Sequence, residues 1–219
     1  MDEIEIKEKI LKGAEKLFLK YGIRSVSMDD IARHLTISKK TLYQHFADKE
    51  ELVVMFSKAH IERITKEFDD LRISSANAIE ELAKISTCMR RQMEDMNPSV
   101  FLDLQKYHAK GWAEWVVHKE NVIRESVVRN IRQGIAEGHF RQEITPEIFA
   151  AFRLAVIEFP FDDRIFPREK FSLAEVQSQL FDHFVYGLVT EKGRKLYLKY
   201  KESNNGTTQP ITHTHETIL

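Results

Sequence analysis

The residues best placed to do chemistry lie in a short basic segment near the N-terminus. Between residues 31 and 47 the chain carries Arg33, Lys39 and Lys40 but no acidic residue. In a protein whose formal net charge is −1, such a segment is typical of a surface that binds phosphate groups. A solvated helix face that lacks acids would have the same composition. Charge alone therefore leaves nucleic-acid binding and a plain surface as alternatives.

The helix predicted over residues 38–46 favours nucleic-acid binding. Ser38 is a good N-cap, and Leu42 and Phe46, four residues apart, form the buried face. At 100° per residue the opposite face is centred on Gln44. Ammonium groups and a side-chain amide in the first half of a helix are suited to reading base edges in the major groove. The side chains predicted on or beside this exposed face are Lys39, Lys40, Thr41, Tyr43 and Gln44.

The neighbouring helices must hold this helix in place. Apolar residues at steps of three and four predict a first helix over residues 6–21. Ser27 and Asp30 form a capping box for a short second helix, which only two residues separate from the third. Asp48 and Glu51 form another capping box and begin a long fourth helix. Two short helices joined by so tight a turn, between two longer helices, predict a helix-turn-helix unit.

The composition favours an all-α fold. The 219 residues are 42% hydrophobic and include 8 glycines and 5 prolines, about half the usual share of ~12% for these two residues. No apolar run approaches the ~18 residues needed to cross a membrane, and the acidic N-terminus does not resemble a secretory signal. The single cysteine, Cys88, cannot form an internal disulfide. We therefore expect a cytoplasmic protein of about nine or ten helices.

The sequence lacks the patterns of enzymes built on helical scaffolds. It has no Glu-x-x-His pair for a di-iron centre, no His-Glu-x-x-His zinc helix, and glycines too scattered for a phosphate loop. We therefore expect no catalytic residue, metal or cofactor. The alternative to a DNA-binding regulator is a helical interaction protein or an enzyme-like bundle without sequence-specific DNA binding. That alternative leaves the exposed face around Gln44 without a role.

Aromatic and methionine side chains concentrate in the helices after residue 52. Such residues, with a few polar tips, suit an adaptable apolar ligand cavity, and ordinary core packing uses the same residue types. One helix, predicted over residues 49–71, joins this region to the N-terminal unit. The candidate ligand-binding residues are Phe56, His60, Met89, Met93, Phe101, Tyr107, His108, Trp112 and Trp115.

Two helices near the C-terminus carry more apolar surface than one subunit can easily cover. Between residues 148 and 159 only Arg153 and Glu158 are charged, and the helix that follows Ser172 has a broad apolar stripe. We therefore expect a homodimer in which these helices meet. The candidate interface residues are Phe149, Phe152, Val156, Val176, Leu180, Phe184, Val185 and Leu188.

The segment LTISKKTLYQHFADKEEL, after AEKLFLKYGIRSVSMDDIA, resembles the N-terminal DNA-binding domain of TetR-family transcriptional regulators over residues 6–52 of the 219. Two positions depart from the family pattern: Thr36 stands where many members have glycine, and Lys40 where many have a small residue. The resemblance implies that Ser27, Tyr43, His45 and Lys49 contact phosphates. It implies that Ser38, Lys39, Lys40, Thr41 and Gln44 lie in the DNA groove.

The resemblance also implies a division of the chain and a mechanism. Residues 1–48 would form the helix-turn-helix domain and residues 49–201 a helical ligand-binding and dimerisation domain, whose last two core helices pair into a four-helix interface. The polar residues 202–219 are expected to form a disordered tail. The expected function is a ligand-responsive transcriptional repressor. It would bind a palindromic operator as a homodimer and be released by a small, mostly apolar effector.

Overall fold

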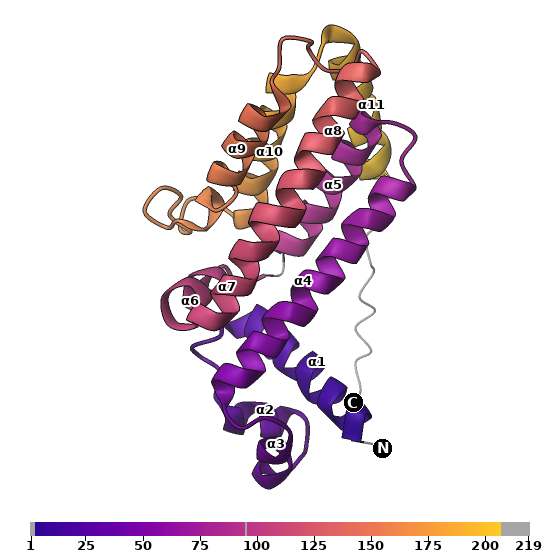
Figure 1. Cartoon of the computed structure of the whole chain (residues 1–219). Helices are drawn as coiled ribbons and strands as arrows, with labels where there is room; N and C mark the ends of the chain where they lie inside the picture. Colours follow the sequence, from indigo (N-terminus) through magenta and orange to yellow (C-terminus); the bar gives the residue numbers. More distant parts are fainter. Residues whose placement is uncertain (1–2, 95, 207–219) are drawn as a thin grey trace, which may run out of the picture.

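The computed structural model of the chain describes residues 3–94 and 96–206 (Figure 1). In these residues every regular element is helical, and the only β-type pairing is an isolated bridge between Phe140 and Val189. The prediction of an all-α fold is confirmed. With α7 and α8 counted as one interrupted helix, the described residues form ten α-helices. None of these helices combines the length and apolar character that crossing a bilayer requires.

Three short or medium helices pack against the start of a fourth at the N-terminal end of the molecule. Figure 1 shows α4 running from this unit along the rest of the protein. The helices are α1 (Glu3–Tyr21), α2 (Met28–His34), α3 (Lys39–His45) and α4 (Lys49–Ile73). Their order and lengths are those of the predicted helix-turn-helix unit.

Side-chain caps fix where the short helices begin. The Ser27 Oγ accepts a hydrogen bond from the Asp30 N–H, and the Asp30 carboxylate accepts one from the Ser27 N–H, so the predicted capping box is formed. Ser38 caps α3 by accepting a hydrogen bond from an N–H of its first turn at 3.0 Å. The apolar faces of all four helices then close one buried cluster, in which the rings of Phe18 and Phe56 meet edge to face at 5.4 Å.

The turn between α2 and α3 contains a strained residue. Thr36 has φ +55°, and it is the only non-glycine residue with positive φ in the described part of the chain. A side chain in this left-handed conformation costs roughly 1–2 kcal/mol, and a β-branched one is especially unsuited to it. The turn therefore has the geometry for which glycine is common at this position.

We expect Thr36→Gly to stabilise the protein. Relief of the strain, less the ~0.5–1 kcal/mol of extra backbone entropy that glycine loses on folding, leaves a gain of about 0.5–1 kcal/mol. Thermal unfolding should show a midpoint about 1–4 °C higher. Thr36→Ala is the control, because it keeps a Cβ and hence the strain. A higher midpoint for Thr36→Ala than for Thr36→Gly would contradict this account.

The remaining helices form the larger part of the molecule beyond the N-terminal unit, with α4 along one side (Figure 1). They are α5 (Ala78–Glu94), α6 (Ser99–Tyr107), α7 (Ala109–His118), α8 (Arg124–Ala136), α9 (Pro146–Val156), α10 (Leu173–Leu188) and α11 (Glu191–Gly206). A π-helical segment, Lys119–Ile123, joins α7 to α8, and a short 3₁₀ segment, Phe159–Phe161, follows α9. A second buried cluster lies where α5, α8, α10 and α11 pack together.

Three sequence expectations need correction. Regularly spaced apolar residues predict one long helix over residues 112–137, but the π-helical segment interrupts it. Such segments often occur beside functional sites. The helix expected over residues 146–158 ends at Val156. The tail expected from residue 202 is wrong for residues 202–206, because α11 continues to Gly206. Tyr197 of this helix is fully buried, and its hydroxyl donates a hydrogen bond to Asp182 at 2.8 Å. Residues 207–219 of that tail lie outside the described residues.

Candidate nucleic-acid interface and ligand cavity

The exposed face of α3 has the composition that its sequence predicts. Lys39, Lys40, Tyr43 and Gln44 are exposed, whereas Leu42 is fully buried. Thr41 is half-buried, and its hydroxyl lies 2.8 Å from that of the N-cap Ser38. The side chain of His45 is half-buried at the border of the core. This face offers cations and an amide, and none of its members belongs to the buried cluster of the unit.

Two of the predicted DNA-contacting lysines are engaged within the protein. The Lys39 ammonium forms an exposed ion pair with Asp29 of α2 at 2.6 Å. The Lys49 ammonium donates a hydrogen bond to the Ile23 carbonyl oxygen at 2.7 Å. Partial burial lowers the pKa of Lys49, and the charges of nearby acids oppose this shift. Lys49 therefore ties the start of α4 to the turn after α1, whereas Lys40 has no hydrogen bond or ion pair among the described residues.

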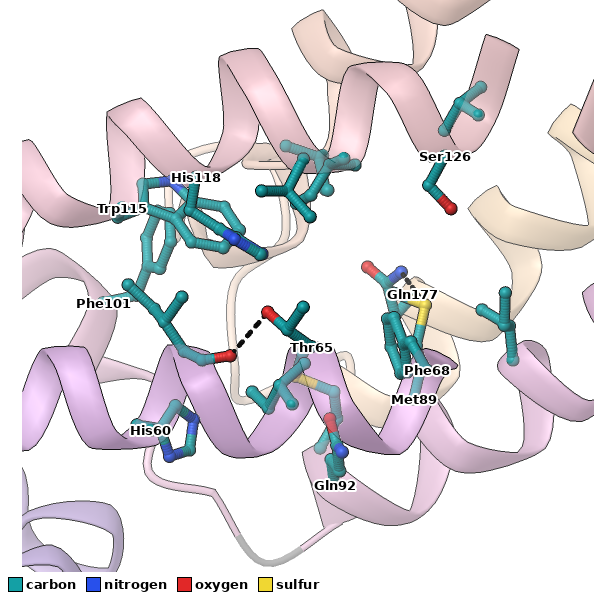
Figure 2. A pocket seen from close by; sticks show the side chains of 18 of the residues that line it. His60, Thr65, Phe68, Met89, Gln92, Phe101, Trp115, His118, Ser126 and Gln177 are labelled. Carbon is teal, nitrogen blue, oxygen red and sulfur yellow. Dashed lines mark hydrogen bonds between the residues drawn. The ribbon is translucent and has the colours of Figure 1, made fainter. Parts of the chain in front are cut away.

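An apolar cavity of about 250 Å³ lies between α4, α5, α7, α8 and α10 (Figure 2). Its wall is mostly hydrophobic, as expected of a site for an apolar molecule. Of the residues predicted from the sequence, it is lined by Phe56, His60, Met89, Met93, Phe101, Trp112 and Trp115. Lining residues that the sequence analysis missed include Ile61, Thr65, Phe68, Gln92, His118, Ser126, Arg153 and Gln177.

Tyr107 and His108 do not line this cavity. Tyr107 is 55% exposed, and the guanidinium of Arg24 lies over its ring at 5.2 Å. His108 stands between α6 and α7, where its Nδ1 is 2.6 Å from a carboxylate oxygen of Glu50. The aromatic pattern of this segment predicts both side chains in the cavity, and that prediction is wrong. Helix α6 ends at Tyr107, and the two side chains contact Arg24 and Glu50 of the N-terminal unit.

Aromatic rings form one end of the cavity. Phe101 stacks on Phe161 at 4.2 Å and meets the rings of Trp112 and Trp115 edge to face at 5.1 and 5.6 Å. Figure 2 shows Phe101 and Trp115 together at this end, with His118 beside them. Burial lowers the pKa of His118, which favours the neutral imidazole at neutral pH. This end of the cavity is therefore apolar and uncharged.

His60 marks the wall of the cavity nearest the N-terminal unit. Its Nδ1 lies 3.0 Å from the Glu15 carboxylate, which also accepts a hydrogen bond from Arg63 at 2.9 Å. The hydrogen bond with His60 and that with Arg63 lower the pKa of Glu15 against the opposing effect of burial. This cluster joins α4 to α1, so His60 serves the contact between helices as well as the cavity wall.

Hydrogen bonds also connect α6 to the N-terminal unit. The Asp103 carboxylate accepts a hydrogen bond from the Arg24 N–H at 2.9 Å, and the Asn97 N–H donates one to the Leu19 carbonyl oxygen at 2.7 Å. Val100, on the same helix, is part of the buried cluster of the N-terminal unit. Since Phe101 lines the cavity, α6 contacts both the cavity and the helix-turn-helix unit.

The expected dimer surface is only partly available. Val176, Phe184, Val185 and Leu188 are buried within the subunit, so their assignment to an interface is corrected. Their stripe on α10 faces the subunit's own core, where α5 packs against it. Phe152 is 48% exposed, and the other predicted residues, Phe149, Val156 and Leu180, are half-buried.

Cys88 is a buried thiol with no reactive character. Burial, together with the Glu67 carboxylate that accepts its S–H hydrogen bond at 3.1 Å, raises the pKa of Cys88 to about 12. We expect no reaction with a thiol-specific chromogenic reagent at pH 8 in the native protein, and rapid reaction after denaturation. Because this is the only cysteine, the count of reacted thiols is unambiguous. Rapid native-state reaction would show that the thiol is accessible and ionised.

Comparisons with known proteins agree with this architecture. Residues 10–54 match the model of a family described as bacterial regulatory proteins, tetR family. The transcriptional repressor KstR2 of Mycobacterium tuberculosis is 25% identical over 146 residues, which are 65% of this chain and 73% of that protein. The uncharacterized regulator YvaF of Bacillus subtilis is 24% identical over 188 residues, or 84% of this chain and 96% of that protein.

A solved structure has the same fold over most of its length. The transcriptional regulator of the TetR family from Agrobacterium tumefaciens superposes with a TM-score of 0.71, covering 86% of this chain and 100% of that one, at 15% sequence identity. At that identity the likeness concerns the fold. The match of residues 10–54 to the family model, together with the similarity to KstR2 and YvaF, relates the N-terminal unit to transcriptional regulators.

Proposed function

This chain belongs to the TetR family of transcriptional regulators, and from that premise we propose that it is a repressor controlled by a small ligand. It binds a palindromic operator as a homodimer through α3 and leaves the DNA when a mostly apolar effector enters the cavity. The observation that carries this proposal is the placement of the two sites. The exposed face of α3 and the cavity lie in the same subunit. Helices α4 and α6 contribute both to the buried cluster beneath α3 and to the wall of the cavity.

The shared helices supply the coupling between the sites. Leu52, Val53 and Phe56 of α4 belong to the buried cluster of the N-terminal unit, while Ile64 and Phe68, farther along the same helix, line the cavity. An effector that prefers one position of α4 or α6 must therefore move the N-terminal unit. A coupling free energy of about 1–3 kcal/mol would change the affinity for DNA by 5- to 150-fold.

The division of the chain follows the same helices. We assign residues 1–48 to DNA binding and residues 49–201 to ligand binding and dimerisation. The buried cluster of the N-terminal unit extends past this boundary to Phe56 and Val100. That continuity supports the coupling, because the DNA-binding unit is completed by residues of the second part.

We assign the dimer contact to α9 and its neighbours. Ile148, Phe152 and Ala155 are exposed at spacings of four and three, so they form an apolar stripe along the outside of α9. Phe159, in the 3₁₀ segment that follows α9, is also exposed. Exposed apolar patches of this kind mark association surfaces. The half-buried residues Phe149, Val156 and Leu180 of the original expectation would border this stripe.

Selection of bound duplexes from a random DNA pool tests the proposed function. We expect a salt-sensitive palindromic site whose half-sites are about 34–36 Å apart, or a multiple of that distance. The matched control is a variant with Lys40→Ala and Gln44→Ala together, which alters the exposed face without touching the core. Enrichment of no duplex by the wild-type protein would contradict the proposal, and so would equal enrichment by the control.

A further inference from the structure

Arg153 of α9 is a buried cation in the wall of the cavity. Arg153 is only 4% exposed. Its guanidinium forms no hydrogen bond or ion pair with any described residue. Its guanidinium lies over the rings of Phe181 and Phe184, with the Cζ atom 5.1 and 5.8 Å from the two ring centroids. Two ring faces attract a cation but satisfy none of its five N–H donors.

Among the residues that the structure describes, no carboxylate forms an ion pair with this cation. Among the acids in or near the cavity, Glu81 is paired with Arg129 at 2.5 Å and Glu158 with Lys119 at 2.6 Å. Burial lowers the pKa of Arg153 to about 10, and no nearby charge contributes to the shift. The guanidinium therefore stays protonated at neutral pH, and its burial without a partner is unfavourable in the empty protein.

A second polar group lies on the same side of the cavity. Gln177 is 2% exposed and lines the cavity one turn before Phe181 on α10. Its amide nitrogen donates only to the Met89 thioether, at a sulfur distance of 3.9 Å (Figure 2). A thioether is a weak acceptor, so this donor can turn to a better one at little cost.

We propose that the effector is an amphipathic monocarboxylic acid whose carboxylate binds Arg153, with Gln177 beside it. This inference rests on the proposed function, since it names the chemical class of the effector. The planar guanidinium matches a carboxylate in two parallel hydrogen bonds. The apolar body of the acid lies against the rings of Phe101 and Trp115 at the uncharged end of the cavity.

The charges around the cavity favour an effector with one negative charge over an effector with two. In the described part of the chain, the only other lysine or arginine that lines the cavity is Arg72, which is paired with Asp69 at 3.2 Å. One available positive charge therefore balances a monocarboxylate, while a phosphate dianion would stay partly unneutralised. The free volume of about 250 Å³ corresponds to roughly eight water-sized units of ~30 Å³, which suits a medium-chain acid.

Binding of decanoate and of decan-1-ol to the purified full-length protein tests this inference. These probes share a chain and differ in charge, so the ratio of their dissociation constants isolates the carboxylate. Calorimetry or tryptophan fluorescence should show decanoate binding at least 10-fold more tightly than the alcohol to the wild-type protein. In Arg153→Met the ratio should fall to about one or reverse. Arg132→Met, which removes an exposed arginine of α8, should leave the ratio unchanged.

The unliganded variant provides an independent readout. Removal of an unpaired buried charge should raise the thermal midpoint of Arg153→Met above that of the wild-type protein by about 2–4 °C. A lowered midpoint would mean that Arg153 stabilises the fold, and it would overturn the inference. An acid that binds no more tightly than its alcohol, or a ratio that is unchanged in Arg153→Met and in Arg153→Gln, would overturn it as well.

The same protein preparations distinguish this inference from the proposed function. If decan-1-ol releases DNA as well as decanoate does, the ligand-controlled repressor stands and the carboxylate site is wrong. If no duplex is bound under any condition, the proposed function fails, while the ratio of the two dissociation constants still decides whether Arg153 selects an acid.

Discussion

Val185→Glu should yield unfolded or insoluble protein. Val185 is fully buried in the cluster formed by α5, α8, α10 and α11, and a glutamate there would have no room and no partner. We expect the free energy of unfolding to fall by more than about 4 kcal/mol, which is a large part of the ~5–15 kcal/mol that stabilises an ordinary protein. Circular dichroism and the yield of soluble protein measure this directly.

Phe152→Glu is the matched control for that variant. Phe152 is 48% exposed on α9, so the same change in charge should leave the subunit folded, with a thermal midpoint within a few degrees of wild type. Sedimentation should show a monomer, because the charge lies on the proposed dimer surface. A folded, monomeric Val185→Glu protein would show that Val185 belongs to the dimer interface after all. A dimeric Phe152→Glu protein would show that the apolar stripe of α9 is not the dimer interface.

Gln44→Ala should change which DNA sequences are bound. An exposed amide at the centre of the outer face of α3 can form two hydrogen bonds with an adenine edge. Its loss should relax the preference at one base position by about 1–3 kcal/mol, or roughly 5- to 150-fold. Competition between the selected operator and its single-position variants measures this effect.

Tyr43→Phe and Lys66→Ala complete that experiment. Tyr43→Phe removes a hydroxyl assigned to a phosphate, so it should weaken binding to all sequences alike. Lys66 is exposed on α4 beyond the N-terminal unit, and its removal should leave base preference unchanged. If Gln44→Ala weakens every duplex equally, the amide contacts the DNA backbone and the assignment of base reading to Gln44 is wrong.

Local sequence patterns predict the helix-turn-helix unit well because short-range interactions determine it. Ser27, Ser38 and Asp48 cap the helices that follow them, and these caps depend on residues three positions away. The strained turn at Thr36 could also be anticipated, because many proteins of the family that this segment resembles have glycine at that position. The boundaries in this region needed no knowledge of the rest of the chain.

Long-range packing decided the features that the sequence did not predict. An apolar stripe such as that of Phe184 and Val185 shows that a surface is covered, but it does not show whether the same subunit or a second one covers it. In this protein α5 covers it. The extension of α11 to Gly206 likewise depends on Tyr197 entering the core, which its own polar sequence does not indicate.

The cavity was predicted by residue type and only partly by position. Most of the predicted aromatic and methionine residues line it, but Tyr107 is the last residue of α6 and His108 follows it, and neither side chain reaches the cavity. In the sequence, Arg153 is one of two charged residues in an otherwise apolar stretch. Because burial of a charge is costly, a charged residue in an apolar helix is a useful indication of a site for a polar partner. Gln177 carried no comparable indication, because its burial follows from the packing of α10.

The most direct test of ligand control is a titration that follows the cavity and the DNA together. Trp112 and Trp115, the only tryptophans, both line the cavity, so their fluorescence reports its occupancy. With the tightest binder among compounds that include decanoate and decan-1-ol, we expect both signals to change over one concentration range, with affinity for the operator falling 5- to 150-fold. By linkage, operator DNA should weaken the ligand by the same factor. Saturation of the fluorescence change with no change in DNA affinity would contradict the account.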